Sequence, residues 1–435
     1  FALSELDFDD VNDVGPVHLT ASGILKGRDF NIKGTFPPLE QALDHDLPKP
    51  VVVSLVGDRL EAHLDGTITD PANGQGMDFN IELSVPEMHE FLEAFGDGIP
   101  PVGAMLASAR LQGDYAVPRL TDIDVHMHRG EAVDLTVIGS VNNIFSGDGM
   151  NLHLAGRSTH PQVASWLLFK TVDAISAFHF DGLLQEQNGN FHIKDLTAEV
   201  KTSNGLVLSA SGAGELYDAL HQFSASDNGI ELQVTAPSTD ALNLVQVEAV
   251  PDLGAVTGRT RLIVSRDAVG LYDADLNVGN TSSAAAHLQG QIGRFPLHDK
   301  SSVSDIDLKV DIKTADIAAL AKIFGYELEH SAPGHVVTHV SGDSSKLDLG
   351  QTDISIGTKE GALVSASGKA KNLVVTDTGI SADAEFSVTA SASDLGRFSA
   401  LAGTDLPELG AVAASGKPVS YTHLRAHETG RHISY

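Results

Sequence analysis

Apolar and polar residues alternate along many short segments of the chain, as in the segment from Met77 to Val85. Its odd-numbered positions are apolar and its even-numbered positions are polar, so a strand here has one apolar face and one hydrated face. Similar runs occur at 121–128, 133–141 and 306–312, and turn pairs such as Asn73-Gly74 separate them. This pattern predicts an antiparallel sheet built from hairpins.

The alternating runs belong to an internal repeat that is marked by glycines. Gly66, Gly139, Gly212, Gly290 and Gly368 lie 73, 73, 78 and 78 residues apart. Short helical patches, each introduced by Pro, Ser or Thr, recur in step with these glycines, and their first apolar anchors are at 88, 163, 242, 317 and 395. The shared period predicts about five repeats of roughly 76 residues, each with about five strands and one short helix.

The predicted fold is therefore mainly β with short helices (α+β), in a repetitive, elongated, curled antiparallel β-sheet that forms a groove. Residues 1–50, which contain several prolines, are predicted to be an irregular leading segment, and 51–418 a single elongated array. In the final segment, 419–435, the stretch SYTHLRAHET resembles translated sequencing-adapter read-through. We interpret that segment as a non-native tail and expect the array to be truncated at both ends.

The predicted apolar surface exceeds what the predicted helices can cover. A helix is about 10 Å wide and strands lie about 4.8 Å apart, so one short helix covers two or three strands. The rest of the apolar face must be covered by the sheet curling onto itself or by a ligand such as an acyl chain, and both remain open. The candidate positions for a lipid groove are Leu64, Ile68, Phe79, Ile81, Leu83, Val125, Met127, Leu135, Val137, Leu152 and Leu154.

Composition narrows the range of partners. The chain has 58 acidic and 28 basic residues and a formal net charge of -30, so it repels phosphate backbones and nucleic acid is not an expected partner. It contains no cysteine, which excludes disulfides and thiolate metal sites. No catalytic residue, cofactor or metal site is predicted, and the chain is not expected to be an enzyme.

Two groups of possible metal ligands have simpler interpretations. His126 and His128 lie on the same face of a predicted strand, where a hydrated polar surface is favoured over a metal pair. Asp7, Asp9, Asp10 and Asp13 lack the spacing of an EF-hand loop, so an acidic sheet edge is favoured over a calcium site.

His427 and His432 resemble a zinc-protease motif, but they lie five residues apart rather than the four that one helical face requires. They also belong to the segment interpreted as a tail.

The segment 66–125 resembles the repeated unit of the AsmA and TamB family. In that unit an alternating strand leads to a short helix, then to a proline step with a glycine turn, and then to a strand that contains a central glycine. The proline step is present as IPPVG at 99–103, VPDLG at 250–254 and LPELG at 406–410. The second and fourth repeats lack a clear step, and the resemblance covers most of residues 50–416.

The resemblance implies a non-enzymatic protein of envelope biogenesis, specifically a groove-type phospholipid transfer or bridge protein between the inner and outer membranes. It implies a periplasmic body attached to the bacterial inner membrane by an N-terminal anchor that is missing from this chain. The implied partners are phospholipid acyl chains and outer-membrane assembly proteins. The alternative is a periplasmic structural or assembly scaffold for outer-membrane proteins, with a self-packed β core.

Overall fold

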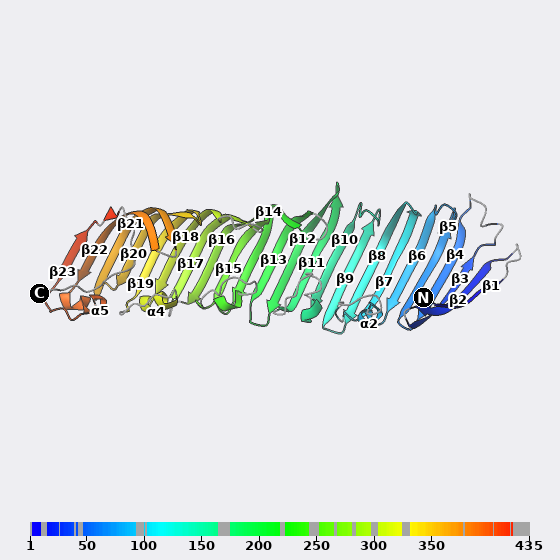
Figure 1. Ribbon diagram of the computed structural model, residues 1–435, viewed down its shortest axis with the longest axis horizontal. Helices are drawn as coiled ribbons and strands as arrows, with labels where there is room; N and C mark the ends of the chain where they lie inside the picture. The colour runs from blue at the N-terminus through cyan, green and yellow to red at the C-terminus, as the bar shows by residue number, and fades with distance from the viewer. Residues whose placement is uncertain are drawn as a thin grey trace. The chain divides into compact units, whose positions relative to one another are not determined.

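The computed structural model places most of the described residues in strands, with short helices between some of them (Figure 1). It describes residues 2–9, 15–25, 27–38, 41, 47–92, 100, 102–163, 175–217, 222–242, 252–264, 268–280, 284–296, 303–323, 331–376, 379–402, 404–417 and 419–420. The predicted class, mainly β with short helices and a curled, repetitive antiparallel sheet, is confirmed.

The chain divides into two compact units. Unit 1 comprises Phe1–Asn204 and Ser209–Phe223, and unit 2 comprises Gly205–Leu208 and Ser224–Tyr435. The division falls inside the predicted array of residues 51–418 and coincides with neither predicted boundary.

Unit 1 is an antiparallel sheet in which β1 to β12 pair in chain order. Its elements are β1 (Ala2–Asp9), β2 (Val17–Leu25), β3 (Arg28–Phe36), β4 (Lys49–Gly57), β5 (Leu60–Ile68), β6 (Met77–Val85), α2 (Met88–Leu92), β7 (Ala104–Asp114), β8 (Val117–Arg129), β9 (Val133–Val141), β10 (Asn151–Ser158), β11 (Ile175–Gln187), β12 (Asn190–Thr202) and most of β13 (Val207–Tyr217).

Unit 2 repeats this arrangement, and its strands also pair antiparallel in chain order. Of the segment that the sequence predicts to be a non-native tail, 419–435, only residues 419–420 are described. They form β24, which pairs with Ala384 and Glu385 of β22, and residues 421–435 lie outside the described residues. The elements are most of β14 (Gln222–Ala236), η1 (Thr239–Leu242), β15 (Val256–Val264), β16 (Ala268–Asn280), β17 (Ala284–Pro296), β18 (Ser304–Thr314), α4 (Ile317–Ile323), β19 (Gly334–Asp343), β20 (Lys346–Gly357), β21 (Ala362–Thr376), β22 (Gly379–Ala392), η2 (Leu395–Phe398), α5 (Ser399–Ala402), β23 (Val412–Gly416) and β24 (Val419–Ser420).

The prediction that residues 1–50 are irregular is wrong, because β1, β2 and β3 lie there and pair with one another. Pro16 precedes β2 and Pro37 follows β3, and Pro50 stands within β4 opposite Thr67 of β5. Pro50, in β4, lies before Val52, where pairing with β3 begins. A residue without an N–H is tolerated at such positions, so these prolines mark strand ends.

Among the described residues, each full repeat contains four strands, whereas the sequence pattern predicts about five. β15 to β18 lie between η1 and α4, and β19 to β22 lie between α4 and η2. In unit 1, β7 to β10 lie between α2 and the helical residues 161–163. The overestimate arises because β-bulges interrupt the alternation within long strands. In β8, for example, the register shifts between Leu120 and Ile123, so one strand reads as two shorter runs.

The repeated glycines stand where neighbouring backbones approach too closely for a side chain. A Cβ added to Gly66, Gly139 or Gly290 would lie 2.0 Å from the carbonyl oxygen of Asp78, Asn151 or Asp307, respectively. The φ angles of these three glycines are 157°, 148° and 139°. Only glycine adopts such a backbone without strain and permits such an approach, which explains why the sequence repeat is marked by this residue.

A second repeated feature, which sequence reasoning missed, consists of aspartates with left-handed backbone. Asp122 in β8, Asp195 in β12 and Asp273 in β16 have φ values of 51°, 52° and 51°. Each stands at a position where the register of its strand shifts. Aspartate tolerates this conformation better than most residues, and the extra residue of a bulge increases the local bend and twist of the sheet.

The short helices pack against one edge of the sheet in each unit, which we call the helix edge (Figure 1). In unit 1, Val102, Val133, Leu135 and Val163 form a buried cluster against which Met88 of α2 packs. In unit 2, the corresponding cluster consists of Leu206, Ala236, Ala241 of η1 and Val256. The fully buried apolar core is therefore concentrated at the helix edge rather than spread over the apolar face.

Replacing Gly139 with alanine should destabilise the fold. The new Cβ would overlap the Asn151 carbonyl oxygen, and alanine would adopt a left-handed φ, which costs about 1–3 kcal/mol by itself. We expect the free energy of unfolding, measured by urea titration, to fall by at least about 2 kcal/mol. The matched control is Gly182→Ala, where the nearest atom would lie 3.5 Å from the added Cβ. Equal effects of the two substitutions would contradict this explanation of the repeated glycines.

Candidate functional site

The apolar side chains of unit 1 form two uninterrupted rows that cross the sheet, which we call the apolar strip. Residues paired across successive strands make up each row, except at the bulge between β7 and β8, where Ala109 and Ile123 are neighbours in the second row without being a register pair. All of these residues are aliphatic, Phe or Gly, so no polar or charged side chain breaks either row. The first row is Leu6, Ala21, Ile32, Leu55, Ala62, Leu83, Ala107, Val125, Val137, Leu154 and Gly182, and the second is Phe8, Leu19, Gly34, Val53, Leu64, Ile81, Ala109, Ile123, Gly139, Leu152, Leu184 and Ile193.

The eleven groove candidates from the sequence share one face of unit 1. Seven lie in the strip, namely Leu64, Ile81, Leu83, Val125, Val137, Leu152 and Leu154. Met127 and Leu135 pair with each other on the side of the helix edge. Phe79 and Ile68 lie on the opposite side of the strip. The shared face was predicted correctly from alternation alone, while a role for these residues in lipid binding stays a prediction.

Burial separates the candidates into two kinds. Leu135 and Phe79 are 4% and 7% exposed and belong to the packed core. The other nine are half-buried, although they lie on the same face. A second layer packed over this face would bury them as deeply as Leu135. From β4 to β10, two half-buried rows therefore run between borders of buried side chains, which include Met105 at the helix edge and Val141 on the other side.

Unit 2 has a comparable face with one difference. Leu276, Leu288 and Val310 form a half-buried row across β16 to β18. On β19 the row meets Thr338, whose hydroxyl lies 2.7 Å from that of Thr352, and the Thr352 hydroxyl also donates to the Gly350 carbonyl at 3.2 Å. These hydroxyls satisfy each other, so the interruption is polar but carries no charge.

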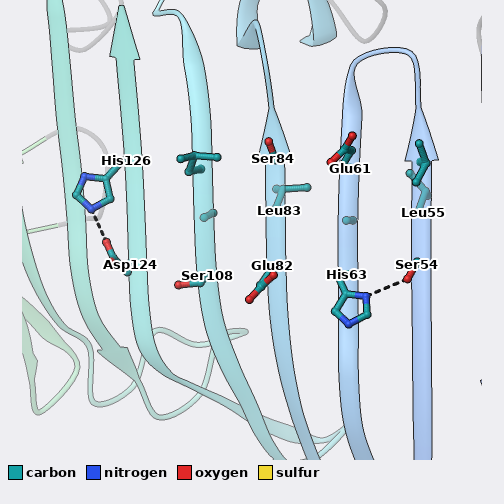
Figure 2. A pocket seen from close by; sticks show the side chains of 14 residues that line it. Ser54, Leu55, Glu61, His63, Glu82, Leu83, Ser84, Ser108, Asp124 and His126 are labelled. Atoms are coloured by element: carbon teal, nitrogen blue, oxygen red, sulfur yellow. Dashed lines mark hydrogen bonds and ion pairs between the residues drawn. The ribbon is translucent and has the colours of Figure 1, made fainter.

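The opposite face of unit 1 is hydrated, and a hollow of about 550 Å³ lies on it over β4 to β8 (Figure 2). Its floor carries Glu61, Glu82 and Ser108, and a hydrogen-bonded pair of side chains that includes a histidine lies at each side. Ser54 Oγ lies 2.9 Å from His63 Nδ1, and His126 Nε2 lies 2.7 Å from an Asp124 oxygen.

The metal alternatives from the sequence find no support in the part of the chain that the structure describes, where no group of three or more suitable side chains converges. His126 hydrogen bonds with Asp124 and contacts the Thr136 hydroxyl at 3.3 Å. His128 is exposed on the same face. Asp7 and Asp9 lie on β1 opposite Thr20 and His18. Asp10, Asp13, His427 and His432 lie outside the described residues.

Ion pairs between neighbouring strands organise the polar face. Two hydrogen bonds of 2.7 Å join the Arg110 guanidinium to the Asp78 carboxylate and lower the pKa of Asp78. In unit 2, the hydrogen bond from His287 lowers the pKa of Asp275. These carboxylates stay ionised, which keeps this face charged, whereas the described part of the apolar strip carries no charged side chain.

Comparison with known proteins found no matching family model, no similar curated protein and no similar solved structure. Among the described residues, no helix is both long enough and apolar enough to cross a bilayer.

The Asp78–Arg110 pair should make a small, pH-dependent contribution to stability. Both side chains are more than 40% exposed, so solvent screening keeps the effect small. Because the folded-state pKa of Asp78 is lowered, the stabilisation is present above the ordinary carboxylate pKa of about 4 and is lost as the pH falls through the folded-state pKa. Arg110→Gln should therefore lower the melting temperature slightly at neutral pH and not at all in strong acid. Arg119→Gln is the control, and a deficit that persists in acid would refute the assignment.

Proposed function

We propose that this chain is a non-enzymatic lipid-handling protein that holds acyl chains along its apolar strip. The observation that carries the proposal is the combination of continuity and partial exposure. The strip crosses β1 to β12 without a polar side chain, and the described side chains in its middle, such as Ile81 and Val137, remain half-buried.

The dimensions and energetics of the strip suit acyl chains. With strands about 4.8 Å apart, the strip is roughly 50 Å long, which exceeds the roughly 15 Å of hydrocarbon in one bilayer leaflet. Each methylene that leaves water gains about 0.8 kcal/mol, so a surface of Leu, Ile, Val and Ala retains a lipid without any specific contact. The strip contains no polar group that would fix a ligand at one point, which favours movement along it over tight binding at one site.

The wider setting rests on the resemblance to the AsmA and TamB family. In this proposal the chain is part of a periplasmic phospholipid transfer or bridge protein attached to the bacterial inner membrane. Its other partners would be outer-membrane assembly proteins. The alternative, a scaffold with a self-packed core, requires the strip to be buried as fully as Leu135, and the partial exposure of Val137 and Leu154 favours the lipid proposal.

Adjacent residues of β9 provide a matched test. Val137 lies in the strip, whereas Ile138 lies on the polar face opposite Asp124 and is 44% exposed. The protein, expressed in a bacterial envelope, would be analysed by native mass spectrometry and lipid extraction. We expect co-purified phospholipid in the wild type and in Ile138→Asp. In Val137→Asp, the acyl chain loses two or three methylene contacts with the strip, which should lower the phospholipid occupancy roughly ten- to fiftyfold.

Folding is checked by circular dichroism and thermal melting of the same samples. A wild-type protein that is folded but free of lipid would reject the proposal in favour of the scaffold. The same conclusion would follow if Val137→Asp remained folded and kept its lipid. Leu135 is unsuitable for this test because an aspartate there would disrupt the buried cluster at the helix edge.

A further inference from the structure

The two long edges of the strip in unit 1 differ in how they are covered. At the helix edge, Val102, Val133 and Val163 are each 0% exposed, and α2 packs over them. A lipid with its acyl chains in the strip cannot place a charged headgroup there, because the headgroup would lose its hydration among buried aliphatic side chains.

The opposite edge consists of hairpin tips, which we call the far rim: residues 69–76, 114–119, 142–150 and 186–190. Backbone hydrogen bonds join these tips to one another. Tyr115 N donates to the Gly74 carbonyl at 2.8 Å, Ile144 N to the Pro118 carbonyl at 3.0 Å, and Glu186 N to the Met150 carbonyl at 2.9 Å. The backbones of the four tips are therefore linked into one continuous rim.

Two aromatic side chains stand on this surface. Tyr115 and Phe145 are 70% and 65% exposed, and their rings meet edge to face at an interplanar angle of 67° with centroids 6.1 Å apart. The Phe145 backbone N donates to the Asn143 side-chain oxygen at 3.0 Å, which fixes the loop that carries the ring. Exposed aromatic rings on an ordered loop offer negative faces to a cation.

The accessible charges of the far rim have one dominant sign. The carboxylates of Asp114 and Asp148 are exposed and that of Glu186 is half-buried, against the exposed cation Arg119, whereas Asp70 is buried and accepts hydrogen bonds from Asn73. Backbone hydrogen bonds from Gly149 and Gly189 lower the pKa of Glu186 and keep it ionised. The Asp114 carboxylate accepts a hydrogen bond from Gly76 N at 2.9 Å, so its charge is also held in place.

We infer that the far rim receives the headgroups of lipids held in the strip, and that it selects headgroups bearing an ammonium group over anionic ones. This inference rests on the proposed function and adds a substrate class to it. The row containing Ile81 continues on β7 at Ala109, and Tyr115 at the tip of the β7–β8 hairpin lies six residues further along, or about 20 Å. The Tyr115–Phe145 pair attracts the ammonium group, and the carboxylates repel a headgroup with net negative charge.

The test uses the full chain, loaded from vesicles with equal amounts of phosphatidylethanolamine and phosphatidylglycerol. Bound lipid is then identified by native mass spectrometry. We expect the wild type to enrich the ethanolamine lipid at least about fivefold, and the double substitution Tyr115→Ser with Phe145→Ser to reduce the enrichment to within about twofold, with the total lipid unchanged. Both rings are exposed, so the double variant should fold, and thermal melting checks this.

A charge reversal gives a second, independent arm. Asp148→Lys, on the far rim, should shift the bound lipid toward phosphatidylglycerol. The control is Glu131→Lys, which makes the same change of charge at an exposed turn between β8 and β9, at the helix edge. It should leave the composition of the bound lipid unchanged.

The outcomes separate this inference from the function on which it rests. If the wild type binds no lipid, the proposed function itself fails. If it binds both lipids in the vesicle ratio, or keeps its preference in the aromatic double variant, the inference is overturned and the proposed function stands. A dimeric wild type that becomes monomeric in the double variant, with unchanged lipid composition, would assign the aromatic pair to a second copy of the chain and also overturn the inference.

Discussion

Strand pairing in a fixed register is the interaction on which the other features of this structure depend. Successive side chains of a strand point to opposite faces, so a slip of one residue would turn the apolar strip to water and the carboxylates inward. In β5 and β6, Leu64 pairs with Ile81 and the adjacent Asp65 pairs with Asn80. The bulges insert extra residues without such an inversion. In β8 the left-handed Asp122 absorbs the extra residue, and Ile123 returns to the apolar face opposite Gly139.

The helices divide the apolar face into a packed part and a half-exposed part. Burial of Val133 and Leu135 beneath the helix edge anchors each hairpin at one end, while strand pairing extends beyond that anchor. The middle of the sheet is therefore held mainly by backbone hydrogen bonds and by contacts between neighbouring side chains on one face. This arrangement lets an apolar surface remain accessible on a folded protein, where it would usually be covered by another layer.

Features that repeat along the chain could be predicted from the sequence. Alternation placed Leu64, Val137 and the other groove candidates on one face, and the period located the helices. The number of strands per repeat was overestimated because a bulge looks like a break between two strands when only alternation is read, as at Asp122. The leading strands were missed because their prolines, such as Pro16, were read as signs of irregular structure rather than as strand ends.

Features that depend on the third dimension could not be predicted in the same way. Leu135 and Val137 are equivalent in the alternation pattern, yet only Leu135 lies beneath the helix edge. Tyr115 and Phe145 are 30 residues apart and meet because two hairpin tips are joined at the far rim. The composition of each hairpin tip shows a turn, but nothing in either segment identifies the other as its neighbour.

The even number of strands in a repeat has a consequence for how such a chain can lengthen or shorten. Antiparallel strands reverse direction at every step, so after four of them the chain returns to the edge from which it started. Successive helices separated by four strands therefore emerge at the same edge, as α4 and η2 do on either side of β19 to β22 in unit 2. The gain or loss of a single strand would send the next helix to the opposite edge, where it would cover the hairpin tips. Changes by pairs of strands preserve the asymmetry between the edges, so the length of the array is free to vary only in steps of one hairpin.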